Sequence, residues 1–202
     1  MKVLLVTDGI FHPPLHGRIA VHQGLEQLDG YAFSHIRSLE QLPARLDEFN
    51  ALVLYFHHKR IRDRTLAVLD EFVSNGGGLL GIHSATASFK QTPHYFEILG
   101  GRFTGHGEVE AIEVKRIGSL DEPFGSLPGF TVKDELYIHE IQPGVKIHFE
   151  ALHGGAPIPI VWTYRYGKGK VCYAVPGHRS ATMKNPVYQE VLKRGLAWVC
   201  QS

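Results

Sequence analysis

The sequence predicts a single α/β domain, residues 1–202, built on a parallel sheet of about five or six strands with helices on both faces. Between residues 2 and 82, short apolar runs of strand length alternate with stretches in which apolar residues recur every three or four positions. This alternation is typical of βαβ units, whose strands pair in parallel. A length of 202 residues and a hydrophobic content of 44% suit one core.

The expected strands of the parallel sheet are continuous apolar runs, the pattern of strands that are covered on both faces. Three glycines at 76–78 end the second helix, and Thr92 followed by Pro93 is a favourable start for the third. We expect parallel strands at residues 2–7, 31–36, 51–56, 79–82 and 170–175, and helices at residues 15–28, 63–75, 93–99 and 186–198.

The alternation of strands and helices stops in the middle of the chain. Residues 101–107 are rich in glycine and end a helix, but they do not join a strand to a helix, so a phosphate-binding loop is not indicated. Beyond them the sequence predicts a smaller antiparallel β element, inserted between residues 107 and 165. Its expected strands are residues 108–116, 131–137, 146–151 and 158–164.

Composition excludes several classes of protein. Twenty-one Lys and Arg balance twenty Asp and Glu, so no nucleic-acid or membrane partner is expected. The N-terminus lacks the pattern of a signal peptide, and two cysteines provide no disulfide framework, so we expect a reduced, cytoplasmic protein. The sequence leaves the oligomeric state open, a homo-oligomer included. Thirteen histidines are many for this length, and histidine is both a metal ligand and a near-neutral acid–base group.

His83 is the centre of the sharpest local motif, Gly81-Ile82-His83-Ser84-Ala85, directly after an expected buried strand. Small neighbours permit the abrupt strand-to-helix turn that, in hydrolases, presents a nucleophile above the sheet. Because open α/β sheets bind ligands at the carboxyl ends of their strands, we expect His83 to be functional. The alternative is a strand-end histidine that only bonds to backbone.

Other candidate side chains follow the same logic. His178 comes after the last strand, and His12 comes after the first. Alternation along a strand places Glu135 and Tyr137 on one face, and a carboxylate in a strand needs solvent or a partner. His106 stands between two glycines, which favours exposure. For each of these, a purely structural position is the alternative.

The order of these motifs resembles the ThuA-like family, named for trehalose utilisation, from the first strand to the closing helix. The resemblance implies a class I glutamine amidotransferase-like, flavodoxin-like sheet and a link to bacterial sugar catabolism. The motifs that carry it are GGGLLGIHSA (76–85), GGRF (100–103) with His106, DELY (134–137), YGKGKV (166–171) and PGH (176–178).

Compared with amidotransferases, this chain has His83 where they carry the elbow cysteine, and His178 where they carry the base. Their usual Pro-Glu after that histidine is missing. Without a thiol at the elbow, glutamine hydrolysis through a thioester is excluded.

The expected function is sugar catabolism by acid–base chemistry of His83, His178 and Glu135 on a glucoside or keto-sugar. Isomerisation, hydration–elimination and hydrolysis are the reaction classes that remain. The same three residues suit a divalent zinc, manganese or iron ion with an open position, or a metal-free acid–base pair. His12, His106 and Tyr137 are the expected carbohydrate contacts. No dinucleotide fingerprint is present, so no nucleotide cofactor is expected.

The alternative function is a carbohydrate-binding or regulatory module that kept the scaffold after losing its nucleophile. Such a module needs an aromatic stacking platform rather than ionisable groups. Trp162, Tyr164 and Tyr166 are the candidates for that platform.

Overall fold

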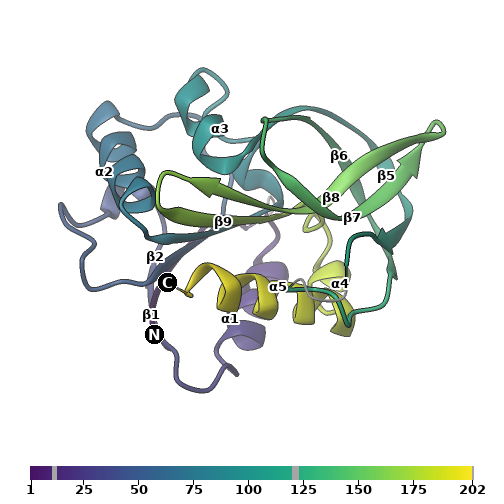
Figure 1. Cartoon of the computed structure of the whole chain (residues 1–202), viewed down its shortest axis with the longest axis horizontal. Coiled ribbons are helices and arrows are strands. Elements are labelled where there is room, and N and C mark those ends of the chain that lie inside the picture. Colours follow the sequence, from purple (N-terminus) through teal and green to yellow (C-terminus); the bar gives the residue numbers. More distant parts are fainter. Residues whose placement is uncertain (11–12, 120–122, 202) are drawn as a thin grey trace.

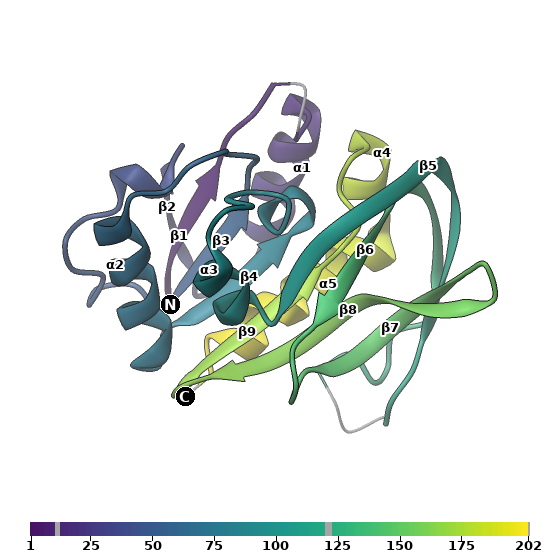
Figure 2. The same cartoon turned by 90° about the horizontal axis from the view of Figure 1, so that it is seen from above.

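The computed structural model describes residues 1–10, 13–119 and 123–201, which form a nine-stranded sheet with helices on both faces (Figure 1, Figure 2). The strands are β1 (Lys2–Thr7), β2 (Ala32–Ile36), β3 (Ala51–Tyr55), β4 (Gly78–Ile82), β5 (Gly101–Arg116), β6 (Phe130–Ile141), β7 (Lys146–His153), β8 (Ala156–Tyr166) and β9 (Gly169–Ala174). The helices are α1 (Leu15–Leu25), α2 (Asp63–Ser74), α3 (Pro93–Leu99), α4 (Ser180–Met183) and α5 (Pro186–Val199), with 3₁₀ turns at Leu39–Gln41 and His83–Ala85.

The sheet has a parallel part and an antiparallel part. Its strand order is β2-β1-β3-β4-β9-β8-β7-β5-β6, in which the first five strands pair in parallel and the others antiparallel. Helices α2 and α3 lie on one face of the parallel part, and α1 and α5 lie on the other (Figure 1). Residues of β3, β4 and β9 are therefore buried throughout, which explains why these strands are continuously apolar.

The antiparallel part is larger than the sequence predicts, because the glycine-rich stretch 101–107 is strand. It spans residues 101–166 rather than 107–165. The pairing of β5 with β6 shifts register between Phe103 and Gly105 and again between His106 and Val109. Such irregularities are where glycine is tolerated within a strand, so these glycines mark bulges rather than a loop.

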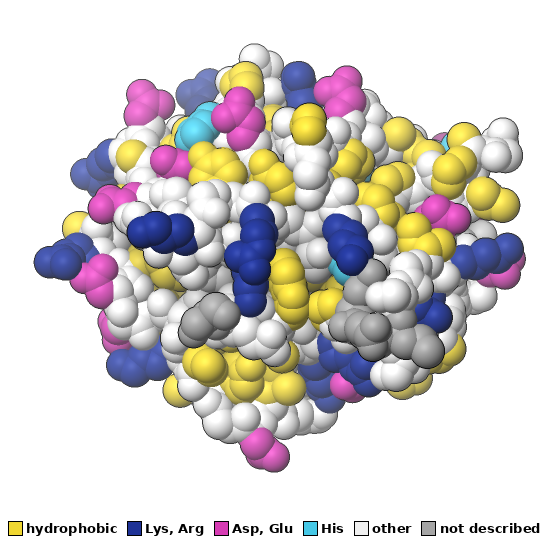
Figure 3. All heavy atoms as spheres, in the orientation of Figure 1, with side chains coloured by type: hydrophobic (Ala, Val, Ile, Leu, Met, Phe, Trp, Pro, Cys, Tyr) yellow, Lys and Arg dark blue, Asp and Glu magenta, His cyan; other side chains and the backbone are white. Residues whose placement is uncertain are grey.

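Smaller differences concern the helix ends. The first helix ends at Leu25, one turn before the expected end at Leu28, and the short helix α4 was not expected. None of the described helices combines the length and apolarity needed to span a bilayer. Figure 3 shows acidic and basic side chains interspersed over one face, in keeping with the net charge of +1.

Candidate active site

Two of the candidate histidines meet at the carboxyl edge of the parallel strands. β4 and β9 are neighbours in the sheet, with Ile82 opposite Ala174. His83 follows β4 directly, and His178 lies a few residues beyond the end of β9. Since both strands run in the same direction, the two side chains reach the same edge. The centroids of their rings are 6.0 Å apart.

Glu135 joins them from the antiparallel part. It lies on β6, at the far end of the strand order from β2, so the antiparallel strands must fold back over the edge of the parallel sheet. Glu135 Oε2 is 3.2 Å from His178 Nδ1. One potential ligand atom from each of His83, Glu135 and His178 lies within 4.8 Å of the other two. Three segments that are distant in sequence therefore converge on one point.

His83 is fixed in an unusual conformation. It is fully buried, and its φ of +47° lies in the left-handed region, which residues with a side chain seldom occupy. Its Nδ1 is 3.0 Å from the carbonyl oxygen of Val175. Because a carbonyl can only accept, Nδ1 carries a proton, and in the neutral ring Nε2 is the nitrogen without one. This tautomer is the one that can bind a metal ion or accept a proton through Nε2.

Asp134, next to the candidate carboxylate, fastens the loop that carries His178. It is completely buried, and its Oδ1 accepts from the backbone amides of His178 (2.9 Å), Gly177 (3.3 Å) and Glu135 (2.9 Å). Its Oδ2 accepts from the amide of Arg179 at 3.2 Å. Sequence reasoning selected only Glu135 of the two adjacent acids. The missed signal is that alternation turns one acid of such a pair toward the interior, where it needs donors.

Tyr137 and His106 lie beside the three converging residues. The ring centroid of Tyr137 is 4.3 Å from that of His83, and burial raises the pKa of its hydroxyl, with the charge of Glu135 adding to the effect. His106 is more exposed and has its Nδ1 4.0 Å from Glu135 Oε1. The structure thus gathers four described candidates around Glu135. The fifth, His12, lies outside the described residues.

One residue of the expected stacking platform, Trp162, is not available to a ligand. Trp162 is completely buried, with its Nε1 donating to the carbonyl of Leu99 at 3.1 Å. Tyr166 donates to Asp70 Oδ1 at 2.5 Å. Trp162 therefore cannot stack on a ligand at the surface, whereas Tyr164 and Tyr166 of the same strand are partly exposed.

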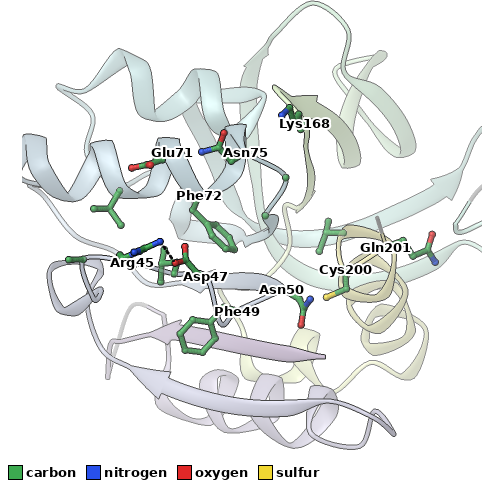
Figure 4. Close-up of a pocket in the computed structure, with 16 residues that line it drawn as sticks. Arg45, Asp47, Phe49, Asn50, Glu71, Phe72, Asn75, Lys168, Cys200 and Gln201 are labelled. Atoms are coloured by element: carbon green, nitrogen blue, oxygen red, sulfur yellow. Dashed lines mark ion pairs between the residues drawn. The ribbon is translucent and has the colours of Figure 1, made fainter.

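A separate cavity of about 580 Å³ lies at the opposite edge of the parallel sheet (Figure 4). Asn50 and Gly77, which precede β3 and β4, line it together with Lys168 and Cys200. The labelled side chains come largely from the ends of α2 and α5 and from the loop before β3, including the ion pair of Arg45 with Asp47 (Figure 4). None of the three converging residues lines this cavity.

Fold and site together define a class: an α/β protein whose mixed sheet brings two histidines and a carboxylate together at the carboxyl edge of its parallel strands. Within that class, the chain belongs to the ThuA family, because the family model described as trehalose utilisation matches residues 2–199. The family resemblance predicted from the motifs is thereby confirmed.

Solved structures share the fold. A ThuA-like protein from Parabacteroides merdae superposes with a TM-score of 0.86 at 21% identity, over 100% of this chain and 90% of that one. A ThuA-like protein from Bacteroides uniformis gives a TM-score of 0.77 at 16% identity, over 98% and 90%. A β-galactosidase from Rahnella sp. R3 gives 0.69 at 13% identity, over 98% of this chain but 30% of the enzyme. No curated protein matches the chain.

Proposed function

We propose that this chain acts on a carbohydrate, a glucoside or keto-sugar, at a centre formed by His83, Glu135 and His178. The observation that carries the proposal is their convergence within 4.8 Å from three separate segments. Ion pairs of surface histidines also occur in this protein, but a buried histidine on a strained turn facing a second histidine and a carboxylate is costly to maintain without a role. The family name supports a sugar as the substrate.

The donor set fits a divalent metal ion. Two imidazoles and one carboxylate are a known ligand combination of catalytic zinc and of non-haem iron, and manganese accepts the same donors. His83 would contribute Nε2, since Nδ1 donates to the carbonyl of Val175. An ion at this point would stabilise negative charge that develops on a substrate oxygen.

The residues themselves can move protons. In the pair of Glu135 and His178, the carboxylate lies where it can orient the imidazole for proton transfer. His106, beside Glu135, and Tyr137, beside His83, would contact a sugar that enters toward His83. Removal of a proton beside a carbonyl group starts isomerisation and elimination alike, so both reaction classes, and hydrolysis of a carbonyl-activated sugar, suit this arrangement. Glu135 and His178 would carry out this proton transfer if no metal ion is bound.

One observation favours the second candidate, a carbohydrate-binding module without activity. In the β-galactosidase from Rahnella sp. R3, the matching region is only 30% of the enzyme, so this fold there forms part of a longer glycosidase. As a module of that kind, this chain would bind or position sugar without proton transfer of its own.

The parallel strands also support an amidotransferase-like, flavodoxin-like origin for the scaffold. Numbered among themselves, they follow the order 2-1-3-4-5 of flavodoxin-like sheets, with β9 as the fifth. His83 occupies the turn after the fourth strand, where the resemblance places the amidotransferase nucleophile.

The first test measures metal content and affinity. We expect the purified protein to bind about one equivalent of Zn²⁺, Mn²⁺ or Fe²⁺, and His83→Ala, Glu135→Gln and His178→Ala each to weaken binding by at least tenfold. His94→Ala is the matched control, because His94 also pairs with two carboxylates, Asp70 and Glu97, but on the surface of α3. Equal losses in the control and the site variants would contradict a metal centre here.

The second test follows glucosides and their keto forms by NMR in deuterated water. Exchange of ring protons with solvent deuterium, or turnover, should occur with the wild-type protein and be lost in His83→Ala. If His83→Ala leaves exchange and turnover unchanged, the acid–base proposal is wrong. Sugar binding that is accompanied by no exchange, with or without His83, would establish the binding module instead.

A further inference from the structure

The backbone carbonyl of His83 is held by buried hydroxyl groups. The hydroxyl of Tyr173 donates to that carbonyl oxygen, and its own oxygen accepts from the amide of Thr86 at 3.0 Å. Thr86 Oγ1 is 2.7 Å from the same hydroxyl and 2.9 Å from His139 Nε2. Tyr173 and Thr86 are completely buried, so these bonds are shielded from competing water.

The sheet register explains how Tyr173 reaches this carbonyl. On β9, Tyr173 lies opposite Gly81 of β4 on one side and Trp162 of β8 on the other. A Cβ on Gly81 would come within 2.5 Å of the Tyr173 ring, so the ring lies where a side chain at position 81 would begin. Trp162 stacks on the ring with centroids 4.5 Å apart and planes inclined by 17°. Packing between Gly81 and Trp162 thus fixes the Tyr173 ring, so that its hydroxyl points at the carbonyl of His83.

Hydrogen bonds at its carbonyl and at its ring therefore determine the orientation of His83. The carbonyl accepts from the hydroxyl of Tyr173 and, at 3.3 Å, from that of Thr86, and the ring donates to the carbonyl of Val175. The left-handed φ of +47° is disfavoured, so the peptide would relax if its carbonyl lost the Tyr173 donor and kept only the longer bond from Thr86. Relaxation would swing the imidazole away from the carbonyl of Val175 and from Glu135 and His178.

We propose that Tyr173 is a positioning residue, whose hydroxyl holds the His83 peptide in the left-handed conformation that aims the imidazole at the candidate centre. The effect of Tyr173 on metal or substrate binding rests on the function proposed above, whereas its effect on the orientation of His83 does not. Tyr173 needs no contact with a ligand for this role.

The test compares Tyr173→Phe with Tyr95→Phe. Both variants keep a buried aromatic ring and lose one hydroxyl that donates to a carbonyl of the same 3₁₀ turn. Tyr95 donates to Ala85 at 3.1 Å, two residues beyond His83. Tyr173→Phe should lose more stability in thermal unfolding than Tyr95→Phe, because the Tyr173 hydroxyl also accepts from the Thr86 amide, and only Tyr173→Phe should change His83. Thr86→Val, which removes the hydroxyl beside that of Tyr173, is a second variant should Tyr173→Phe not fold.

The first readout is the nitrogen-15 NMR spectrum of the histidine side chains in zinc-free protein at one pH near 8. We expect His83 to be protonated at Nδ1 in the wild type and in Tyr95→Phe, and this signal to be lost or averaged in Tyr173→Phe. The second readout is zinc affinity, expected to fall about tenfold in Tyr173→Phe alone.

An unchanged His83 signal in Tyr173→Phe, or the same change in Tyr95→Phe, would overturn the inference. If the wild type binds no zinc, the metal proposal fails, but the NMR comparison still decides whether Tyr173 positions His83.

Discussion

Replacing Asp134 by asparagine removes a buried negative charge while keeping the shape of the side chain. Four backbone amides donate to this carboxylate, those of Glu135, Gly177, His178 and Arg179. An asparagine oxygen can keep the three donors that face Oδ1. Its amino group would then face the amide of Arg179, so one bond is lost and two donors oppose each other.

The expected cost follows from these contacts. Hydrogen bonds to a charged group contribute about 1.5–3 kcal/mol each, and one is lost while three are weakened to neutral bonds. We therefore expect Asp134→Asn to lower the free energy of unfolding by about 3 kcal/mol. In a chain of this length, that corresponds to a fall in Tm of roughly 6–12 °C. Asp134→Ala, which leaves all four donors without this acceptor, should cost about 5 kcal/mol.

Urea and thermal unfolding at neutral pH measure the effect. Asp47→Asn is the control, because Asp47 pairs with Arg45 at 2.8 Å but is 71% exposed, and an exposed pair contributes less than about 1 kcal/mol. A loss below about 0.5 kcal/mol for Asp134→Asn, or one equal to that of the control, would refute the view that Asp134 fastens the His178 loop.

Three further predictions concern other positions. Burial lowers the pKa of His139 to about 3, so the unfolded chain binds one more proton than the folded chain between about pH 3 and 6.5. The free energy of unfolding should therefore fall by up to about 1.4 kcal/mol per pH unit on acidification through that window. Urea titrations should show a shallower fall in His139→Gln. The hydrogen bond with Glu97 raises the pKa of His94 in the folded protein. The stabilisation from this bond is therefore complete below about pH 6.5 and is lost as the pH rises through the pKa of the folded protein. An NMR titration should show a lower pKa of His94 in Glu97→Gln. In Gly177→Ala, the new Cβ would lie 2.6 Å from the Cβ of His83. We therefore expect thermal unfolding to show a stability loss of about 1–3 kcal/mol, and the His83 imidazole to be displaced. Unchanged zinc affinity would argue against that displacement.

The parallel part of the fold could be predicted because its signals are local. A strand covered on both faces must be apolar throughout, as β3 and β4 are, and the helix between them carries an apolar stripe. The same logic located His83 and His178, since a residue after such a strand lies at the ligand-binding edge.

Long-range features could not be predicted in this way. Nothing local in the sequence indicates that the antiparallel strands fold back to bring Glu135 to His178, because that contact joins elements far apart in the strand order. The glycines of residues 101–107 also hid the start of β5, which the sequence placed at residue 108, because the pairing with β6 imposes a strand there. The burial of Trp162 could not be predicted for a related reason, since whether an aromatic side chain faces solvent depends on which strands flank it.

The fold-back of the antiparallel strands has a consequence for how the chain folds. His83, Glu135 and His178 are separated by long stretches of sequence, so bringing them together carries loop-closure entropy that local structure cannot offset. The centre can therefore form only once β6 has docked on the loop after β9. A ligand that spans the three residues would act as a reversible cross-link between the two parts of the sheet. Its binding should slow hydrogen exchange in β5 and β6 far more than in β1 and β3, whose pairing does not depend on that docking.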